Sequence, residues 1–552
     1  MKKLISLVLT FVMLFAVMAP AASVSAINER TPIIYIRGNG EFIYREDNSL
    51  VPANFESLNF DSEESGIDKD KIVETAVNIL KPFILEGMLF DQWDNYGKAI
   101  YEEISPLFKD SGLDYDGNPT GGSGISKEVL NTSVAASHSP NNFYANTAYK
   151  FCYDWRLSPY DHVDRLHGYI KDIMVATGAT QVSLYARCLG GSLLSAYIER
   201  YGSEGHIKNV MFSDVLSNES TTISKAFSGQ IEFDAKTVER FLAQTEYCDE
   251  IEYGIGFTFS GLLHEIVFES MSFFTQINAT DGVLDGVEAL YEKLYKALVP
   301  ALCHAIGFAT QINNWTCVAE EDMDTALNLM FGKEGSELRT KYAGLIEKIQ
   351  YYREHVSSDL EGFYTEAKKN NIHIGFLAKY GFVNMPFTKD ADLLSDTMVS
   401  VEHATMGATC AKIGQTLSDS YIASHDSKYI SPDKQIDLST GFAPDSTWVF
   451  KNNHHSLDWA SEPLIIAFLN GTNETVESIG MPRFNVVDQK TKTCVAMTED
   501  NCADLDFMTL PVEEPTTESI FVAAMRWFTM LFKVIGMLLR GEISFGEAKE
   551  IL

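Results

Sequence analysis

The segment Gln181–Tyr201, QVSLYARCLGGSLLSAYIERY, contains the residue best suited to covalent chemistry, Cys188. A thiolate is a strong nucleophile, and three local features would lower the pKa of this thiol. They are the neighbouring Arg187, the N-terminal end of the helix expected to follow, and partial exposure at a turn. A free cysteine is also among the most buried residue types, so a packed and inert Cys188 is the alternative. The segment therefore indicates either a nucleophile or a small core residue.

The elements on either side of Cys188 would have to expose its side chain. An apolar, β-branched run at 181–185 predicts a strand, and apolar positions 193, 194 and 197 predict a helix. Strand, sharp turn and helix are the parts of the nucleophile elbow of α/β-hydrolases, whose usual pattern is Gly-x-Ser-x-Gly. In this chain cysteine occupies the serine position, and Ala186 replaces the first glycine.

A second turn could complete the site. Residues 31–44, TPIIYIRGNGEFIY, predict a buried strand that ends in a Gly-Asn-Gly turn. In this fold the loop after an early strand supplies one of two backbone N–H groups that stabilise an oxyanion. Asn39 or Gly40 is the candidate for that donor, and Leu189 is the candidate for the other. A plain hairpin turn at 38–40 is the alternative.

Residues 145–159, ANTAYKFCYDWRLSP, predict a strand followed by the tetrapeptide YDWR, with a helix from His162. On its own, YDWR could be an ion pair packed under an aromatic ring. Together with the elbow it resembles the lecithin:cholesterol acyltransferase family of α/β-hydrolases, particularly the exported bacterial members. The likeness runs from about residue 31 to 470. It implies an α/β-hydrolase fold, with a mostly parallel central sheet and a helical cap insertion. The elbow departs from the histidine-serine pair of that family, because Arg187 and Cys188 stand there.

The resemblance also implies the partners of the nucleophile. The family places its acid in an Asp-x-x-Val context, which Asp396 matches, and its base in the loop after the last strand, expected at Ser446–Phe450. Two histidines stand in that loop, and we favour His455, with His454 as the alternative base. The order Cys188, Asp396, His455 is the nucleophile–acid–base order of the fold.

The spacing of apolar residues predicts the domain organisation. Residues 233–370 are too long for one crossover and read mostly as helices with broad apolar faces, which predicts a cap over the site suited to an acyl chain. A packed helical subdomain is the alternative. The hydrolase core is then expected in two parts, 27–232 and 371–509.

The predicted function is that of an exported lipid acyl hydrolase or O-acyltransferase, which acts on acyl esters through a thioester on Cys188. Acyl donor and acceptor stay open, and no cofactor is expected. No metal cluster stands out, because His304 and His403 are isolated and His162 and His167 do not share a helical face. The alternative is an inactive relative that binds lipid or a membrane at the cell surface. A third interpretation is an enzyme that uses another serine, Ser183 or Ser192.

Composition and the two ends bear on partners and location. The net charge of -33 argues against nucleic acid as a partner. Residues 1–26 fit a cleavable signal peptide, with an uncleaved anchor as the alternative, so we expect a secreted or cell-surface protein. Residues 510–552 predict a linker and an amphipathic helix, in which 520–540 would lie on a membrane surface. The alternatives for that helix are docking on the core and a membrane span.

Export permits disulfides, and the chain has eight cysteines. Cys494 and Cys502 flank a polar loop that they could close, and Cys303 and Cys317 flank a helix end and a turn. The spacing proves neither pairing. Cys152, in an apolar strand, is expected to be an inert core thiol.

Overall fold

The computed structural model describes residues 31–38, 42–52, 75, 78–79, 81–88, 92–126, 148–215, 219–230, 240–241, 243–244, 247–248, 284–384, 391–472 and 474–509. The predicted signal peptide (1–26) and the predicted membrane-surface helix (520–540) lie outside these residues, as does Asn39. Within the part described, no helix combines the length and the apolar character that crossing a bilayer requires.

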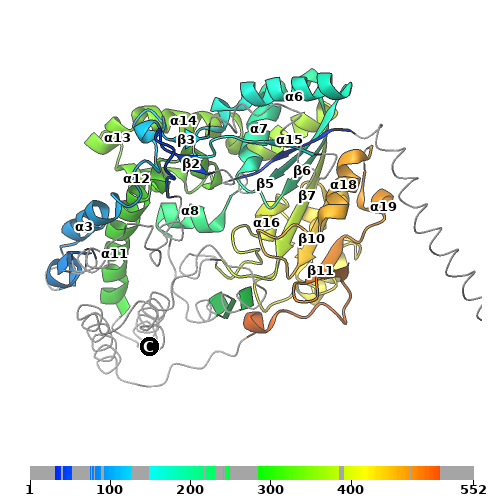
Figure 1. Ribbon diagram of the computed structural model, residues 1–552. Coiled ribbons are helices and arrows are strands. Elements are labelled where there is room, and N and C mark those ends of the chain that lie inside the picture. The colour runs from blue at the N-terminus through cyan, green and yellow to red at the C-terminus, as the bar shows by residue number, and fades with distance from the viewer. Residues whose placement is uncertain are drawn as a thin grey trace, which may run out of the picture.

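An eight-stranded sheet forms the centre of the protein (Figure 1). Its strands, in spatial order, are β12 (Thr493–Ala496), β11 (Phe484–Asp488), β10 (Thr447–Lys451), β7 (His373–Tyr380), β6 (Ile207–Ser213), β5 (Val182–Arg187), β1 (Ile33–Ile36) and β4 (Ala148–Phe151). All neighbours are parallel except β11 and β12. The predicted α/β fold with a mostly parallel central sheet is confirmed.

The expectation that Ser446–Phe450 is the last strand is wrong, because β11 and β12 extend the sheet beyond it. The edge strand β12 is short, and its burial pattern is mostly exposed. An exposed edge strand needs no run of apolar residues, so the pattern of apolar residues in its sequence does not predict it.

The two faces of the sheet carry separate hydrophobic clusters, as the alternation of side chains along a strand requires. On β5, Leu184 and Ala186 belong to the larger cluster, whereas Tyr185 belongs to the smaller one. The larger cluster includes residues of α6 (Val163–Thr177) and α7 (Gly190–Tyr201), and the smaller includes residues of α18 (Glu462–Asn470). Helices on both faces therefore hold β5, and with it the turn that follows, in place (Figure 1).

The long insertion between β6 and β7 is helical over most of its described length. Its helices are α8 (Thr221–Ser228), α11 (Leu284–Ala305), α12 (Met323–Phe331), α13 (Glu337–Lys341), α14 (Ala343–His355) and α15 (Leu360–Lys369). Both α14 and α15 contact α7. A 3-10 segment of the insertion, η10 (Ile312–Cys317), reaches the start of α7, where Ser192 Oγ lies 2.5 Å from Asn313 Oδ1. The insertion thus packs on the helix that follows the elbow.

The YDWR tetrapeptide forms the ion pair that its sequence suggested. Arg156 Nη2 lies 2.8 Å from Asp154 Oδ2, and both side chains are buried. The same guanidinium donates to the carbonyl groups of Asp110, Ser111 and Ser123. Because every donor on this buried cation has a fixed acceptor, the motif ties the segment 110–123 to the end of β4.

All eight cysteines are free in the structure. The two pairings considered from the sequence, Cys494 with Cys502 and Cys303 with Cys317, are therefore not formed. Burial raises the pKa of Cys303 to about 12, as expected for an inert thiol in apolar surroundings.

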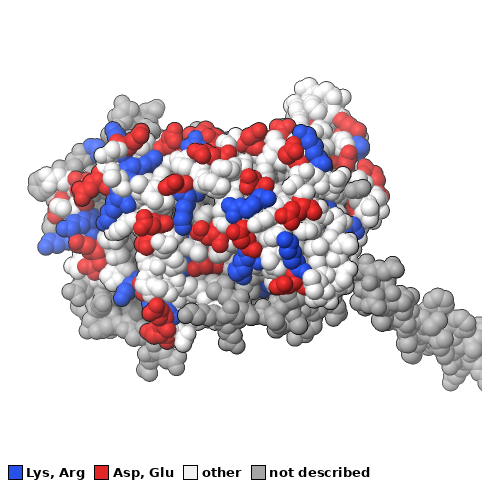
Figure 2. All heavy atoms as spheres, turned by 90° about the horizontal axis from the view of Figure 1, so that it is seen from above, with Lys and Arg blue, Asp and Glu red and all other residues white. Residues whose placement is uncertain are grey.

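The described surface agrees with the acidic composition. Figure 2 shows acidic side chains spread over one face, with basic side chains scattered among them. A broad basic stripe of the kind that tracks a phosphate backbone is not seen on the described part of that face.

Candidate active site

The turn between β5 and α7 has the backbone of a nucleophile elbow. Cys188 adopts a φ of 55°, a left-handed conformation that is uncommon for residues other than glycine. At Gly190 a Cβ atom would lie only 2.2 Å from the carbonyl oxygen of Ile36, so glycine is required where α7 approaches β1. A non-glycine residue is held in this strained conformation only when the surrounding structure demands it. The structure therefore places Cys188, which is half-buried, at the tip of a tight bend.

Asp396 and His455 meet beside the elbow. His455 Nδ1 lies 2.8 Å from Asp396 Oδ2, and both side chains are buried. The other carboxylate oxygen of Asp396 accepts the backbone N–H groups of Met398 and Val399, each at 2.9 Å. The backbone N–H of His455 also donates to the carbonyl of Asp396 at 3.0 Å. These contacts fix the ring, with Nδ1 on the carboxylate and Nε2 left for another partner.

His454 faces a different environment. Its Nδ1 accepts the N–H of Ser456 at 3.2 Å, and its Nε2 lies 3.3 Å from the hydroxyl of Thr397. Burial lowers the pKa of His454 to about 3, so this ring is uncharged near neutral pH. The structure thus brings His455, and not His454, into contact with Asp396.

Cys188 and His455 shift each other's pKa. Burial raises the pKa of the Cys188 thiol, but attraction to His455, reinforced by Arg187 and the N–H of Leu189, holds it below its ordinary value. Burial lowers the pKa of His455, but Asp396 and Cys188 outweigh that effect and raise it to about 10. Among the described residues, the buried Nε2 of His455 forms no hydrogen bond with a nitrogen or oxygen atom, and Cys188 is the group that interacts with this ring opposite Asp396. This arrangement favours a thiolate–imidazolium pair over a neutral thiol and a neutral imidazole.

Gly38 packs directly against the turn that carries Cys188. A Cβ atom at this position would lie 2.9 Å from the backbone nitrogen of Leu189 and 3.1 Å from Sγ of Cys188. An oxyanion formed by attack of the sulfur has to occupy a place within reach of both atoms. The backbone nitrogen of Leu189 thus borders the place where an oxyanion would form, and its role as a donor stays a prediction, whereas Asn39 lies outside the described residues. Gly38 lies in the same Gly-Asn-Gly turn as Asn39 and Gly40, but no local pattern distinguishes it from the other glycine of that turn.

We expect Gly38→Ala to reduce ester turnover by at least about 10²-fold, comparable to removal of one oxyanion donor. Its φ is not positive, so alanine adds a methyl group without demanding a left-handed backbone. Steady-state kinetics on a chromogenic ester measure the loss, and circular dichroism verifies the fold. Turnover equal to that of the wild type would contradict an oxyanion position between Gly38 and Leu189.

A buried group of charges lies beneath the loop of His455. Arg187 pairs with Asp458 at 2.8 Å and donates to the carbonyl of His455 at 2.7 Å. Lys379, at the end of β7, donates to the same carbonyl at 3.1 Å and pairs with Asp458 at 2.9 Å and Asp214 at 2.8 Å. Burial raises the pKa of Asp214 to about 6, although Lys379 acts to lower it. Arg187 thus has a second role beside its effect on the thiol, because it holds the loop of the base.

We expect Lys379→Met to lower the free energy of unfolding by about 3–5 kcal/mol, since it leaves the buried Asp214 without its cation and Asp458 with Arg187 alone. The exposed Lys369, paired only with Glu366 of its own helix, offers a matched control. Lys369→Met should change stability by less than about 0.5 kcal/mol. Urea denaturation at neutral pH compares the two variants, and equal stabilities would show that the buried ion pairs contribute nothing.

The other serines considered as nucleophiles face elsewhere. Ser183 donates to the carbonyl of Leu469 at 2.6 Å, and Ser192 donates to the carbonyl of Leu189 at 2.7 Å. Both side chains are fully buried. Neither hydroxyl is presented to a base, so the geometry favours Cys188 over both.

The site therefore contains a strained cysteine, an imidazole held by a carboxylate, and the backbone N–H of Leu189 next to Gly38. This set can perform covalent acyl transfer. The resemblance to lecithin:cholesterol acyltransferases stays a prediction drawn from the sequence. No family model, curated protein or solved structure matches the chain, and a function has to be inferred from this geometry.

Proposed function

We propose that this protein is an exported acyl hydrolase or O-acyltransferase that acts on lipid acyl esters. Cys188 is the nucleophile, His455 the general base and acid, and Asp396 the residue that orients the imidazole. The observation that carries the proposal is the left-handed Cys188 beside an imidazole whose Nδ1 is held by Asp396 at 2.8 Å.

In the first half of the reaction, the sulfur of Cys188 attacks the ester carbonyl carbon, and a C–S bond forms. The carbonyl oxygen becomes an oxyanion in the space beside Gly38, where the N–H of Leu189 donates to it. The C–O bond to the alcohol then breaks, and the departing oxygen takes the proton from Nε2 of His455. The products are a free alcohol and a thioester on Cys188.

In the second half, water or an acceptor alcohol attacks the thioester carbonyl. Its proton passes to Nε2 of His455, the C–S bond breaks, and the sulfur leaves as the thiolate. Asp396 stays ionised throughout, because the two N–H groups and His455 hold its pKa below the ordinary value despite its burial. The cycle needs no metal or other cofactor.

The experiment that tests this proposal is mass spectrometry of the protein after incubation with a short-chain nitrophenyl ester. We expect the mass of one acyl group on the peptide that contains Cys188, and release of that group by hydroxylamine. Addition of an alcohol to the reaction then shows how the acyl group divides between water and acceptor. A protein that binds esters but never acquires an acyl group or releases nitrophenol would instead be a lipid-binding relative.

We also expect Cys188 to react with iodoacetamide at lower pH than an ordinary thiol, whose pKa is about 8.5. Only the thiolate reacts, so a lowered pKa keeps the rate high as the pH falls. His455→Ala removes the main group that lowers the pKa of Cys188, while burial still raises that pKa. The midpoint of the curve of modification rate against pH should therefore move to higher pH. The rate at pH 7 falls about tenfold for each unit of that rise.

The rate of modification as a function of pH is followed by mass spectrometry of the Cys188 peptide. His454→Ala is the matched control, because its ring contacts neither Cys188 nor Asp396 through a hydrogen bond. An unchanged pH profile in His455→Ala would mean that the imidazole does not act on the thiol.

A further inference from the structure

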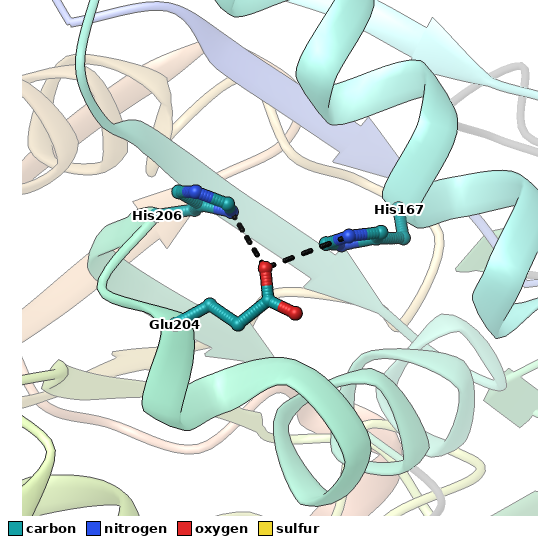
Figure 3. A group of neighbouring side chains, drawn as sticks. All are labelled: His167, Glu204 and His206. Carbon is teal, nitrogen blue, oxygen red and sulfur yellow. Dashed lines mark ion pairs between the residues drawn. The ribbon is translucent and has the colours of Figure 1, made fainter.

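A second group of side chains with ligand chemistry lies at the far end of α7 from Cys188. It consists of His167 on α6, Glu204 in η7 (Gly202–Glu204), and His206 just before β6 (Figure 3). One ligand atom from each residue lies within 4.8 Å of the others. The twelve residues of α7 separate the cluster from the elbow by about 18 Å, at 1.5 Å per residue. The cluster therefore takes no part in the acyl chemistry.

The distances in the cluster suit a bound ion better than a direct ion pair. Glu204 Oε2 lies 3.6 Å from Nε2 of His167 and 3.5 Å from Nδ1 of His206. Charge-assisted hydrogen bonds between such groups are shorter, about 2.7–2.9 Å. In a tetrahedral zinc site with bonds of about 2.0–2.2 Å, neighbouring ligand atoms lie about 3.3–3.6 Å apart. The two distances from Glu204 Oε2 to the histidine nitrogens fall in this range.

His206 adds a second observation. Its Nδ1 is buried and forms no hydrogen bond among the described residues, although it points towards the carboxylate of Glu204 (Figure 3). Leaving a buried ring nitrogen without a partner costs free energy, and an ion at this position would supply the partner. The exposed fraction of the Glu204 side chain is 39%, which leaves the cluster open to an ion from solvent.

The ring of His167 is held ready for such a ligand. Its Nδ1 lies 3.2 Å from the hydroxyl of Tyr197, which leaves Nε2 to face Glu204. Tyr201 stacks on the ring at 3.9 Å, and its hydroxyl donates to Asp164 at 2.7 Å. Outer partners of this kind fix the tautomer and orientation of metal-binding histidines.

We propose that His167, Glu204 and His206 bind one Zn²⁺ ion, with water as the fourth ligand. Two imidazoles and a carboxylate are common zinc ligands, and the ion would connect α6 to the turn between α7 and β6. Its role is structural, because it joins elements that pack side by side away from the elbow. The sequence does not indicate this cluster, because His167 and His206 are far apart in the chain and only the packing of α6 on α7 brings them together.

The test uses the full mature chain, freed of metal by a chelator and titrated with ZnCl₂ against a chromophoric competitor. We expect one equivalent to bind and to raise the melting temperature. Glu204→Gln and His206→Ala should each weaken zinc binding by more than about 100-fold, since a direct ligand matters more than an outer partner. Tyr197→Phe should weaken it by about 10–100-fold while the three ligands remain.

Two controls separate this site from other zinc-binding groups. His355→Ala removes an exposed histidine outside the cluster and should leave the affinity unchanged. Cys188→Ser removes the thiol at the elbow and should also leave it unchanged. Failure to bind one equivalent, equal affinity in His206→Ala and the wild type, or loss of binding in Cys188→Ser would each overturn the proposal. Circular dichroism of the variants distinguishes loss of a ligand from loss of the fold.

Discussion

Cys188→Ala is expected to reduce turnover of acyl esters by about 10⁴- to 10⁶-fold, the range found when a covalent nucleophile is removed. The reason is geometric, because the sulfur stands on a left-handed residue beside His455 and Ser183 and Ser192 are buried and bonded elsewhere. Initial rates with a nitrophenyl ester, at enzyme concentrations high enough to detect the residual rate, measure the loss. Mass spectrometry of the same samples should show no acyl adduct.

The matched control for this variant is Cys494→Ala. Cys494 lies on the edge strand β12, and burial raises the pKa of its thiol, so it lacks the features that activate Cys188. We expect the rate of Cys494→Ala to stay within a factor of about two of the wild-type rate, as surface substitutions usually perturb little. If Cys188→Ala kept full turnover, the covalent mechanism proposed here would be wrong.

His455→Gln is expected to lower turnover by about 10²- to 10⁴-fold, the usual contribution of general acid–base catalysis. Glutamine can still donate to Asp396, so the loop should keep its place while the proton acceptor is lost. His454→Gln is the neighbouring control and should cost less than about tenfold. Burial holds the pKa of His454 near 3, and its ring bonds to Ser456 and Thr397 instead of facing the sulfur.

Rates of both variants are compared over the pH range in which the wild type is active. A loss in His454→Gln equal to that in His455→Gln would point to disturbance of the loop rather than to catalysis. A loss confined to His454→Gln would reverse the assignment of the base. The melting temperatures of the two variants show whether a loss of activity comes from destabilisation of the fold.

The sequence located the elbow well because its signals are local. A β-branched run, a turn with small residues and a helical apolar spacing all lie within Gln181–Tyr201, and β5 and α7 form there. Asp396 and His455 were selected by order and resemblance, and the structure brings their side chains together at 2.8 Å. The sequence alone does not separate His454 from His455, because adjacent residues of a loop carry the same pattern.

Contacts between residues far apart in the chain could not be predicted in the same way. Lys379 reads as an interruption of an apolar strand, and only the neighbouring strand ends supply the carboxylates that explain it. In the sequence Gly38 is an ordinary turn glycine, and only the packing of α7 against β1 shows that a side chain there would meet Leu189 and Cys188. The cluster of His167, Glu204 and His206 likewise depends on how α6, η7 and the start of β6 meet. In each case the partner is set by tertiary packing, which no local pattern records.

The charged residues beneath the loop of His455 also restrict how the site can change over time. Arg187 is the last residue of β5, Asp214 comes directly after β6, and Lys379 lies near the end of β7. Three adjacent strands therefore contribute to one network of ion pairs, which Asp458 completes. Loss of a single member leaves a stranded charge, whereas exchange of several together can restore balance. Substitutions at these four positions should therefore occur together in related sequences. The choice of arginine beside the sulfur thus depends on residues that do not contact the substrate.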